Sequence, residues 1–203
     1  MNFWVCFRLI TEGVFLFTSL LAACIGLLIG ITYQSFLTDQ IELIEYITTH
    51  VVFGQFSTII VLTFLILRLS FLLQLQKISL NEYGFIFESY KRFIFIFILG
   101  AFLAWIFYNS FVLFFYALGI EFSNRGESFQ AVKSLIIDYD IHWTFHSLIR
   151  LLFESVIVSL ALIVENRFLV KATLDPAKAF TRSFMVLLIG LFVIEISDLI
   201  FLS

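Results

Sequence analysis

Apolar residues run almost without interruption through much of this chain. Residues 13–38, 51–67 and 93–120 contain no charged side chain, and residues 147–168 and 183–202 are apolar apart from a few charges. A helix that crosses a membrane needs roughly 20 predominantly apolar residues. The pattern therefore predicts five transmembrane helices. Their expected bounds are residues 5–33, 51–75, 93–119, 147–168 and 183–202.

The segments between these spans are too short to form a separate soluble domain. Residues 76–92 and 165–182 mix charged and apolar side chains, a pattern typical of amphipathic helices that lie on a membrane surface. Each segment can either anchor the chain to lipid or dock a cytoplasmic partner. The expected fold is all-α: a polytopic transmembrane helix bundle, with short amphipathic interfacial helices, in a single integral membrane domain covering residues 1–203.

Composition supports a lipid solvent for this chain. Hydrophobic residues make up 62% and charged residues 13%, whereas soluble domains carry about 25% charged residues. The net charge of −3 comes without a basic stripe, so nucleic acid is not expected as a partner. The lipid bilayer is the expected surrounding. The sequence contains one proline, so any break in a spanning helix must arise from other residues.

The distribution of Lys and Arg predicts the orientation of the chain in the membrane. These residues favour the cytoplasmic side. With the N-terminus inside and five spans, nine of the 12 basic residues fall at the inner boundary and the C-terminus lies outside. The expected location is a bacterial inner or plasma membrane, or the inner membrane of an organelle. The sequence around Cys24 resembles a lipoprotein cleavage box, but the apolar run continues past it, which favours an uncleaved first span.

Small residues recur at helical spacing in two of the predicted spans. Ala22, Gly26 and Gly30 follow one another every four residues, and Gly100 and Ala104 repeat this spacing in the third span. Helices in lipid associate through close packing of such residues. These positions are therefore expected to be helix contact faces. They either pack within the chain or form the seam of a homo-oligomer.

A second spacing links the third and fifth predicted spans. Gly100 follows Arg92 by eight residues, and Gly190 follows Arg182 by the same interval. Both arginines are expected to mark the inner membrane boundary. The match fits an old internal duplication, and it also fits chance among apolar sequences.

Ionisable residues in or beside the apolar spans form two groups by depth. Such residues are costly in a membrane and commonly face protein or water, so they are candidates for function. The inner-face charge cluster contains Glu12, Arg68 and Glu165. The outer-face polar cluster contains His142, His146, Arg150, Glu154, Glu195 and Asp198. In an antiparallel pair of spans, Arg150 reaches the depth of Asp198 and Glu195, which predicts either an ion-pair network or a polar pathway that handles protons.

The histidines add a candidate metal site. His142 and His146 are four residues apart and share one helix face, and His50 also falls on the outer side. Two histidines one turn apart can hold zinc or copper, with His50, Asp138 or Asp140 completing the shell. Haem held between His50 and one of the other two histidines is an alternative, as are pH sensing and an ordinary interfacial role. No cofactor is required by the sequence, and a metal ion is the leading candidate.

The sequence lacks the motifs of the common catalytic sites. It contains no phosphate loop, no dinucleotide fingerprint, no GxSxG and no CxxCH. The leading hypothesis is a non-enzymatic multi-pass subunit of a membrane assembly, acting either as a transport or channel component or as a sensor coupled to a cytoplasmic partner. It would form a homo-oligomer or join other membrane subunits. The alternatives are a membrane enzyme or redox subunit that uses the outer histidines and aspartates, and a structural or immunity-type protein that binds another membrane protein.

Overall fold

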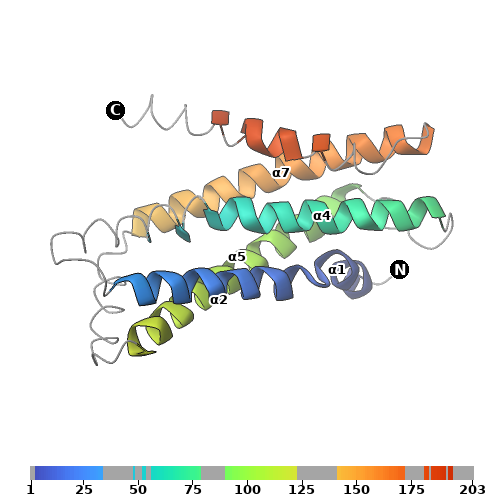
Figure 1. Ribbon diagram of the computed structural model, residues 1–203. Coiled ribbons are helices and arrows are strands. Elements are labelled where there is room, and N and C mark those ends of the chain that lie inside the picture. The colour runs from blue at the N-terminus through green and yellow to red at the C-terminus, as the bar shows by residue number, and fades with distance from the viewer. Residues whose placement is uncertain are drawn as a thin grey trace. The chain divides into compact units, whose positions relative to one another are not determined.

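Almost all of the described part of the chain is helical. The structure is a computed structural model, and it describes residues 3–33, 48, 52–53, 56–78, 90–122, 141–171, 181–182, 184–190 and 192–193. These residues contain no strand (Figure 1). The prediction of an all-helical fold is confirmed for this part of the chain.

Five α-helices carry most of the described residues. Their bounds are α1, Phe3–Thr11; α2, Val14–Tyr33; α4, Ser57–Ile78; α5, Tyr90–Phe122; and α7, Ile141–Lys171 (Figure 1). Residues 184–190 are also helical. The predicted amphipathic helices at 76–92 and 165–182 stay predictions, because residues 79–89 and 172–180 lie outside the described residues.

Three helical stretches are long and apolar enough to cross a membrane. They are Phe3–Thr32, Tyr90–Phe122 and Phe145–Val164, which fall on the first, third and fourth predicted spans. The second predicted span coincides with a shorter apolar helix, Ser57–Leu72. Most of the fifth lies outside the described residues. A membrane protein with transmembrane helices is therefore supported, whereas the count of five spans stays a prediction.

The first predicted span differs from the expectation of one uninterrupted helix. It is divided into α1 and α2, and Gly13 between them has φ of 82°. The Glu12 N–H donates to the Arg8 carbonyl at 2.8 Å, which closes the last turn of α1. Glycine is the residue that adopts a left-handed conformation at a helix end without steric cost. The break thus arises from glycine, as the scarcity of proline requires.

Helix α5 is longer than a membrane requires. Its 33 residues correspond to roughly 50 Å at the 1.5 Å rise of an α-helix, whereas the hydrocarbon core is about 30 Å thick. Lys91 and Arg92 are exposed at its start, and Glu121 is exposed at its end. The charged ends can therefore lie in the two interfacial regions while the apolar centre crosses the lipid.

The chain divides into two compact units. Unit 1 contains residues 1–14, 62–102 and 150–203, and unit 2 contains residues 15–61 and 103–149. Fully buried side chains form the core of each. In unit 1 they include Ile10, Leu65, Leu69, Phe93 and Phe97. In unit 2 they include Ala22, Val61, Tyr108, Val112 and Tyr116.

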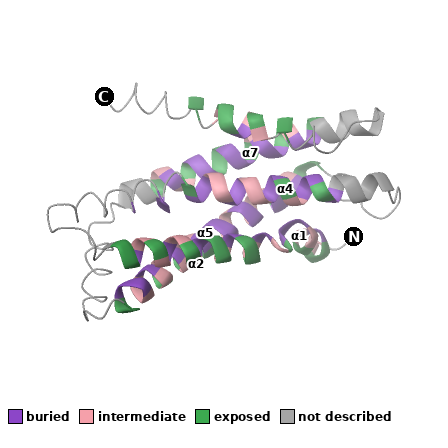
Figure 2. Cartoon of the chain, in the orientation of Figure 1, coloured by how far each residue is buried: buried purple, intermediate pink, exposed green. Residues whose placement is uncertain are grey.

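Large apolar side chains remain exposed along the spanning helices. Figure 2 shows exposed and buried residues alternating along α2 and α5. The exposed residues include Leu16, Phe17, Leu28, Phe95, Phe114, Phe153 and Leu160. In water such surfaces would drive aggregation. In lipid they contact acyl chains, so the pattern of exposure agrees with membrane embedding.

Candidate functional site: the buried carboxyl of Glu154

Within unit 1, helix α7 buries polar side chains among apolar ones. Arg150, Glu154, Ser155 and Ser159 are all buried, whereas Phe153 on the same helix is exposed. Arg150 and Glu154 are four residues apart, as are Ser155 and Ser159, so these positions follow the inward-facing side of the helix. We call these four residues the polar face of α7. A spanning helix that turns charged groups away from lipid is typical of sites that bind or move polar species.

The two serines satisfy their own hydroxyl groups within the helix. Ser155 Oγ donates to the carbonyl oxygen of Leu151 at 2.6 Å, and Ser159 Oγ donates to that of Val156 at 2.8 Å. Such bonds to the preceding turn are common for serine in apolar helices. The serines therefore contribute to the structure of α7, and their protons are not directed at Glu154.

Glu154 is the most unusual residue of the polar face. It is 0% exposed, and neither carboxyl oxygen has a hydrogen-bond partner among the described residues. A Cβ atom placed on Gly190 would lie 2.8 Å from Oε2 of Glu154. The carboxyl group therefore packs directly against the backbone of the helical segment 184–190.

Arg150 is the charged neighbour of this carboxyl on the same helix. Arg150 is 7% exposed and precedes Glu154 by four residues, one turn of α7. The sequence predicted that Arg150 would pair with Asp198 or Glu195. Both acidic residues lie outside the described residues, so this pairing stays a prediction. The spacing signal found Arg150 and Glu154, but nothing in it indicated the contact with Gly190.

The remaining members of the outer-face polar cluster are only partly described. His146 lies half-buried on α7. His50, Asp138, Asp140 and the side chain of His142 lie outside the described residues. Within the described part of the chain, no three His, Cys, Asp or Glu side chains gather closely enough to hold a metal ion. The proposed metal or haem site therefore stays a prediction.

The structure brings together two members of the inner-face charge cluster. Arg68 Nη2 lies 3.3 Å from Oε2 of Glu12, and Arg68 Nε donates to the carbonyl oxygen of Leu9 at 3.0 Å. Leu9 lies in the last turn of α1, where carbonyl groups lack partners within the helix. Arg68 thus caps α1 at the break before α2. The side chain of Glu165, the third predicted member, is not among those described.

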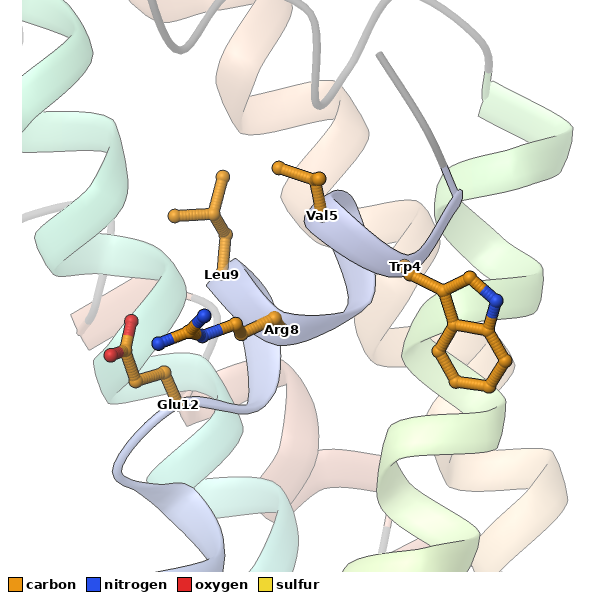
Figure 3. A pocket seen from close by; sticks show the side chains of 5 residues that line it. All are labelled: Trp4, Val5, Arg8, Leu9 and Glu12. Carbon is orange, nitrogen blue, oxygen red and sulfur yellow. The ribbon is translucent and has the colours of Figure 1, made fainter.

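A hollow of about 440 Å³ lies beside α1. It is lined by Trp4, Val5, Arg8, Leu9 and Glu12 (Figure 3). Figure 3 shows the Arg8 side chain extending toward the Glu12 carboxylate, while Trp4 points away from it. The hollow is open and offers mainly apolar surface, which suits lipid better than an enclosed polar ligand.

In unit 2, glycines bring α2 and α5 into backbone contact. A Cβ atom on Gly26 would lie 2.5 Å from the carbonyl oxygen of Val112, and one on Gly30 would overlap the carbonyl oxygen of Tyr116. Gly119 faces Gly30, and a Cβ atom there would lie 2.9 Å from the Cα of Gly30. The sequence predicted Gly26 and Gly30 as contact residues but not Gly119, which has no glycine or alanine four residues before or after it.

The other predicted packing residues also lie in the interior. Ala22 and Ala104 are fully buried. Gly100 is buried in unit 1, where an added Cβ atom would lie 2.9 Å from a methyl group of Thr11. The four-residue spacing therefore falls on close contacts inside the chain.

Comparison with known proteins gives no relative. No protein family, no curated protein and no solved structure matches this chain. Function must therefore be argued from the chemistry of the site itself. Of the features above, the cap by Arg68 and the contacts of the glycines are explained by the stability of the helices. The buried carboxyl of Glu154 is not.

Proposed function

We propose that this chain is a non-enzymatic, multi-pass membrane protein that acts as a transport or channel component within a membrane assembly. The observation that supports the proposal is the polar face of α7, which places Arg150 and Glu154 inside a helix that is otherwise suited to lipid. A structural helix can be packed with apolar residues alone, and buried ionisable groups make it less stable. Their presence favours a role in moving charge across the membrane.

The transport role is preferred over the sensor role because of where the unusual chemistry lies. The buried ionisable groups that the structure describes lie within the spanning part of α7. A sensor would meet its cytoplasmic partner through segments 76–92 and 165–182, of which residues 79–89 and 172–180 lie outside the described residues. Those two segments remain candidates for anchoring the chain or docking a partner.

We further propose five spans, with the N-terminus inside and the C-terminus outside. The support comes from the excess of basic residues at the inner boundary. In this arrangement, Glu12 and Arg68 lie near the inner face, and Arg150 and Glu154 lie toward the outer face. The expected membrane is a bacterial inner membrane or its organellar equivalent.

The proposal is tested by purifying the tagged chain from its native membrane in a mild detergent. We expect a defined assembly, either a homo-oligomer or a complex with other membrane subunits, that catalyses ion flux when reconstituted into vesicles. Native mass spectrometry gives the composition, and dyes that respond to pH or membrane potential report the flux. A chain that purifies alone as a monomer and moves no ion in vesicles would contradict the proposal.

A further inference from the structure

We propose that the carboxyl group of Glu154 is a proton-binding site and that it holds a proton in the resting, packed protein. This inference deepens the proposed transport function by naming the proton as the ion, and its relevance to flux rests on that function. The contacts of the Glu154 side chain carry it.

The first step is the state of a carboxyl group in this position. Both oxygens of Glu154 are buried, and no donor reaches either of them within the described part of the chain. An ionised carboxylate without hydrogen bonds in an apolar interior is highly unfavourable, and such groups become neutral. A carboxyl group that retains its proton carries no net charge and so avoids most of this cost.

The second step is the choice of a proton over a metal cation. Sodium or calcium would require several oxygen ligands around the carboxylate. Among the described residues, no hydroxyl group hydrogen-bonds to either carboxyl oxygen of Glu154, so no set of oxygen ligands is assembled around it there. Arg150, one turn away, adds a positive charge that disfavours a metal cation and a proton alike, so the choice between them depends on the number of ligands. A proton needs only one carboxyl oxygen and no further ligands.

The third step concerns the charged groups that face Glu154. On α7 the charged group is Arg150, and the packed segment 184–190 contains no ionisable side chain. Glu195 and Asp198 follow that segment in the sequence, beyond the described residues. Ionisation of Glu154 would therefore place a negative charge against the apolar segment and the backbone of Gly190, and the positive charge of Arg150 would offset only part of its cost.

The last step links the proton to a movement. With Glu154 neutral, the backbone at Gly190 can approach its Oε2 closely, as the structure shows. Loss of the proton creates a charge that requires water or a donor. The contact at Gly190 covers Oε2, so we expect α7 and the segment 184–190 to separate locally before water can reach the carboxyl and the proton can leave. Proton release is thereby coupled to the packing of these two helical segments.

The inference is tested by infrared spectroscopy of the purified, folded protein at pH 7. Exposed carboxyl groups, whose pKa values lie near 4, are ionised at this pH and give no band from a protonated acid. We expect the wild-type protein to show such a band and Glu154→Gln to lack it. Glu12→Gln is the matched control, because Glu12 is exposed and paired with Arg68, and it should retain the band.

A second acidic variant covers the case in which Glu154→Gln does not fold. Glu154→Asp keeps an acid at the same position, and its band should shift in frequency relative to the wild type. Absence of the band in the folded wild type would overturn the inference. A band that persists unchanged in Glu154→Gln, or in Glu154→Asp if that variant alone folds, would also overturn it.

Flux measurements then separate this inference from the proposed function. The native assembly is reconstituted into vesicles that contain a pH-sensitive dye. A band assigned to Glu154 together with proton flux that Glu154→Gln abolishes would support both proposals. A band assigned to Glu154 without any ion flux in the wild type would support the proton site and contradict the transport role. Ion flux in a protein that lacks the band would support the transport role and overturn the proton site.

Discussion

Arg68 illustrates how a single cation can satisfy the end of a neighbouring helix. It stands in the apolar helix α4 and bonds both the carbonyl oxygen of Leu9 and the carboxylate of Glu12. No water reaches unsatisfied carbonyls in the hydrocarbon region of a membrane. The side chain of Glu12 is 53% exposed, so solvent weakens its attraction to Arg68. The bond to Leu9 is therefore the more important of the two.

Arg68→Leu is accordingly expected to destabilise the protein more than Glu12→Gln. Loss of a charged donor to a carbonyl group costs about 1.5–3 kcal/mol, whereas a partly exposed ion pair contributes at most about 1 kcal/mol. The measurement is the free energy of unfolding of the purified chain in mild detergent. Arg68→Lys is the control for charge alone, because it keeps the positive charge but lacks the planar fork that bonds both acceptors. Equal losses for Arg68→Leu and Glu12→Gln would refute the ranking.

At this scale the sequence predicted which residues are unusual but not what they contact. Glu154 and Arg68 stand out because a charge interrupts an apolar run, and that interruption is visible in the sequence alone. Gly190 became part of the site through its contact with a residue on another helix. A contact between residues so distant in the sequence leaves no periodic mark. The sequence thus predicted Glu154 as a candidate site residue, and the structure added its contact with Gly190.

At the scale of elements, hydropathy predicts the presence of the helices better than their continuity. An average over some 20 residues finds an apolar span, but it is insensitive to one residue with a left-handed backbone. Gly13 divides α1 from α2 without changing the apolar character of Phe3–Thr32. The lengths of α5 and α7 were likewise underestimated, because their polar ends continue the helix beyond the apolar stretch.

Gly13→Ala tests whether the break between α1 and α2 depends on glycine. A residue with a Cβ atom at φ of 82° is strained by about 1–2 kcal/mol. We expect a lower free energy of unfolding for Gly13→Ala, with a smaller loss for Gly13→Asn, because asparagine tolerates this conformation better. An alanine variant as stable as the wild type would show that α1 and α2 can join into one helix without penalty.

The contact between α2 and α5 makes a second prediction about elements. At Gly30 an added methyl group meets the backbone of Tyr116 and Gly119, which cannot rotate away. At Gly100 it meets a side-chain methyl group of Thr11, which can adjust. Gly30→Ala is therefore expected to reduce the free energy of unfolding by about 1–3 kcal/mol, as overpacking does, and Gly100→Ala by less. Thermal unfolding of both variants in the same detergent compares them, and the reverse order would contradict the packing described.

For the whole molecule, lipid is the solvent that reconciles composition with structure. Exposed Phe and Leu side chains on α2, α5 and α7 would be a liability in water. In a bilayer they are favourable, and the driving force for folding shifts to close packing and interior polar contacts. The glycine contacts of unit 2 are an example of close packing. The cap by Arg68 in unit 1 is an example of an interior polar contact. Sequence composition predicted this environment because composition is a property of the whole chain.

The number of spans can be decided by the accessibility of single cysteines in intact cells. After replacement of the two native cysteines, the five-span topology predicts that Asn124→Cys and Ser203→Cys react with a membrane-impermeant maleimide from outside. Asn81→Cys and Lys178→Cys should react only after the membrane is permeabilised, because basic segments stay inside. Ser203→Cys is decisive, since four or six spans would place the C-terminus inside and protect it. Labelling of Asn81→Cys in intact cells would instead reverse the orientation, and with it the assignment of inner and outer charge clusters.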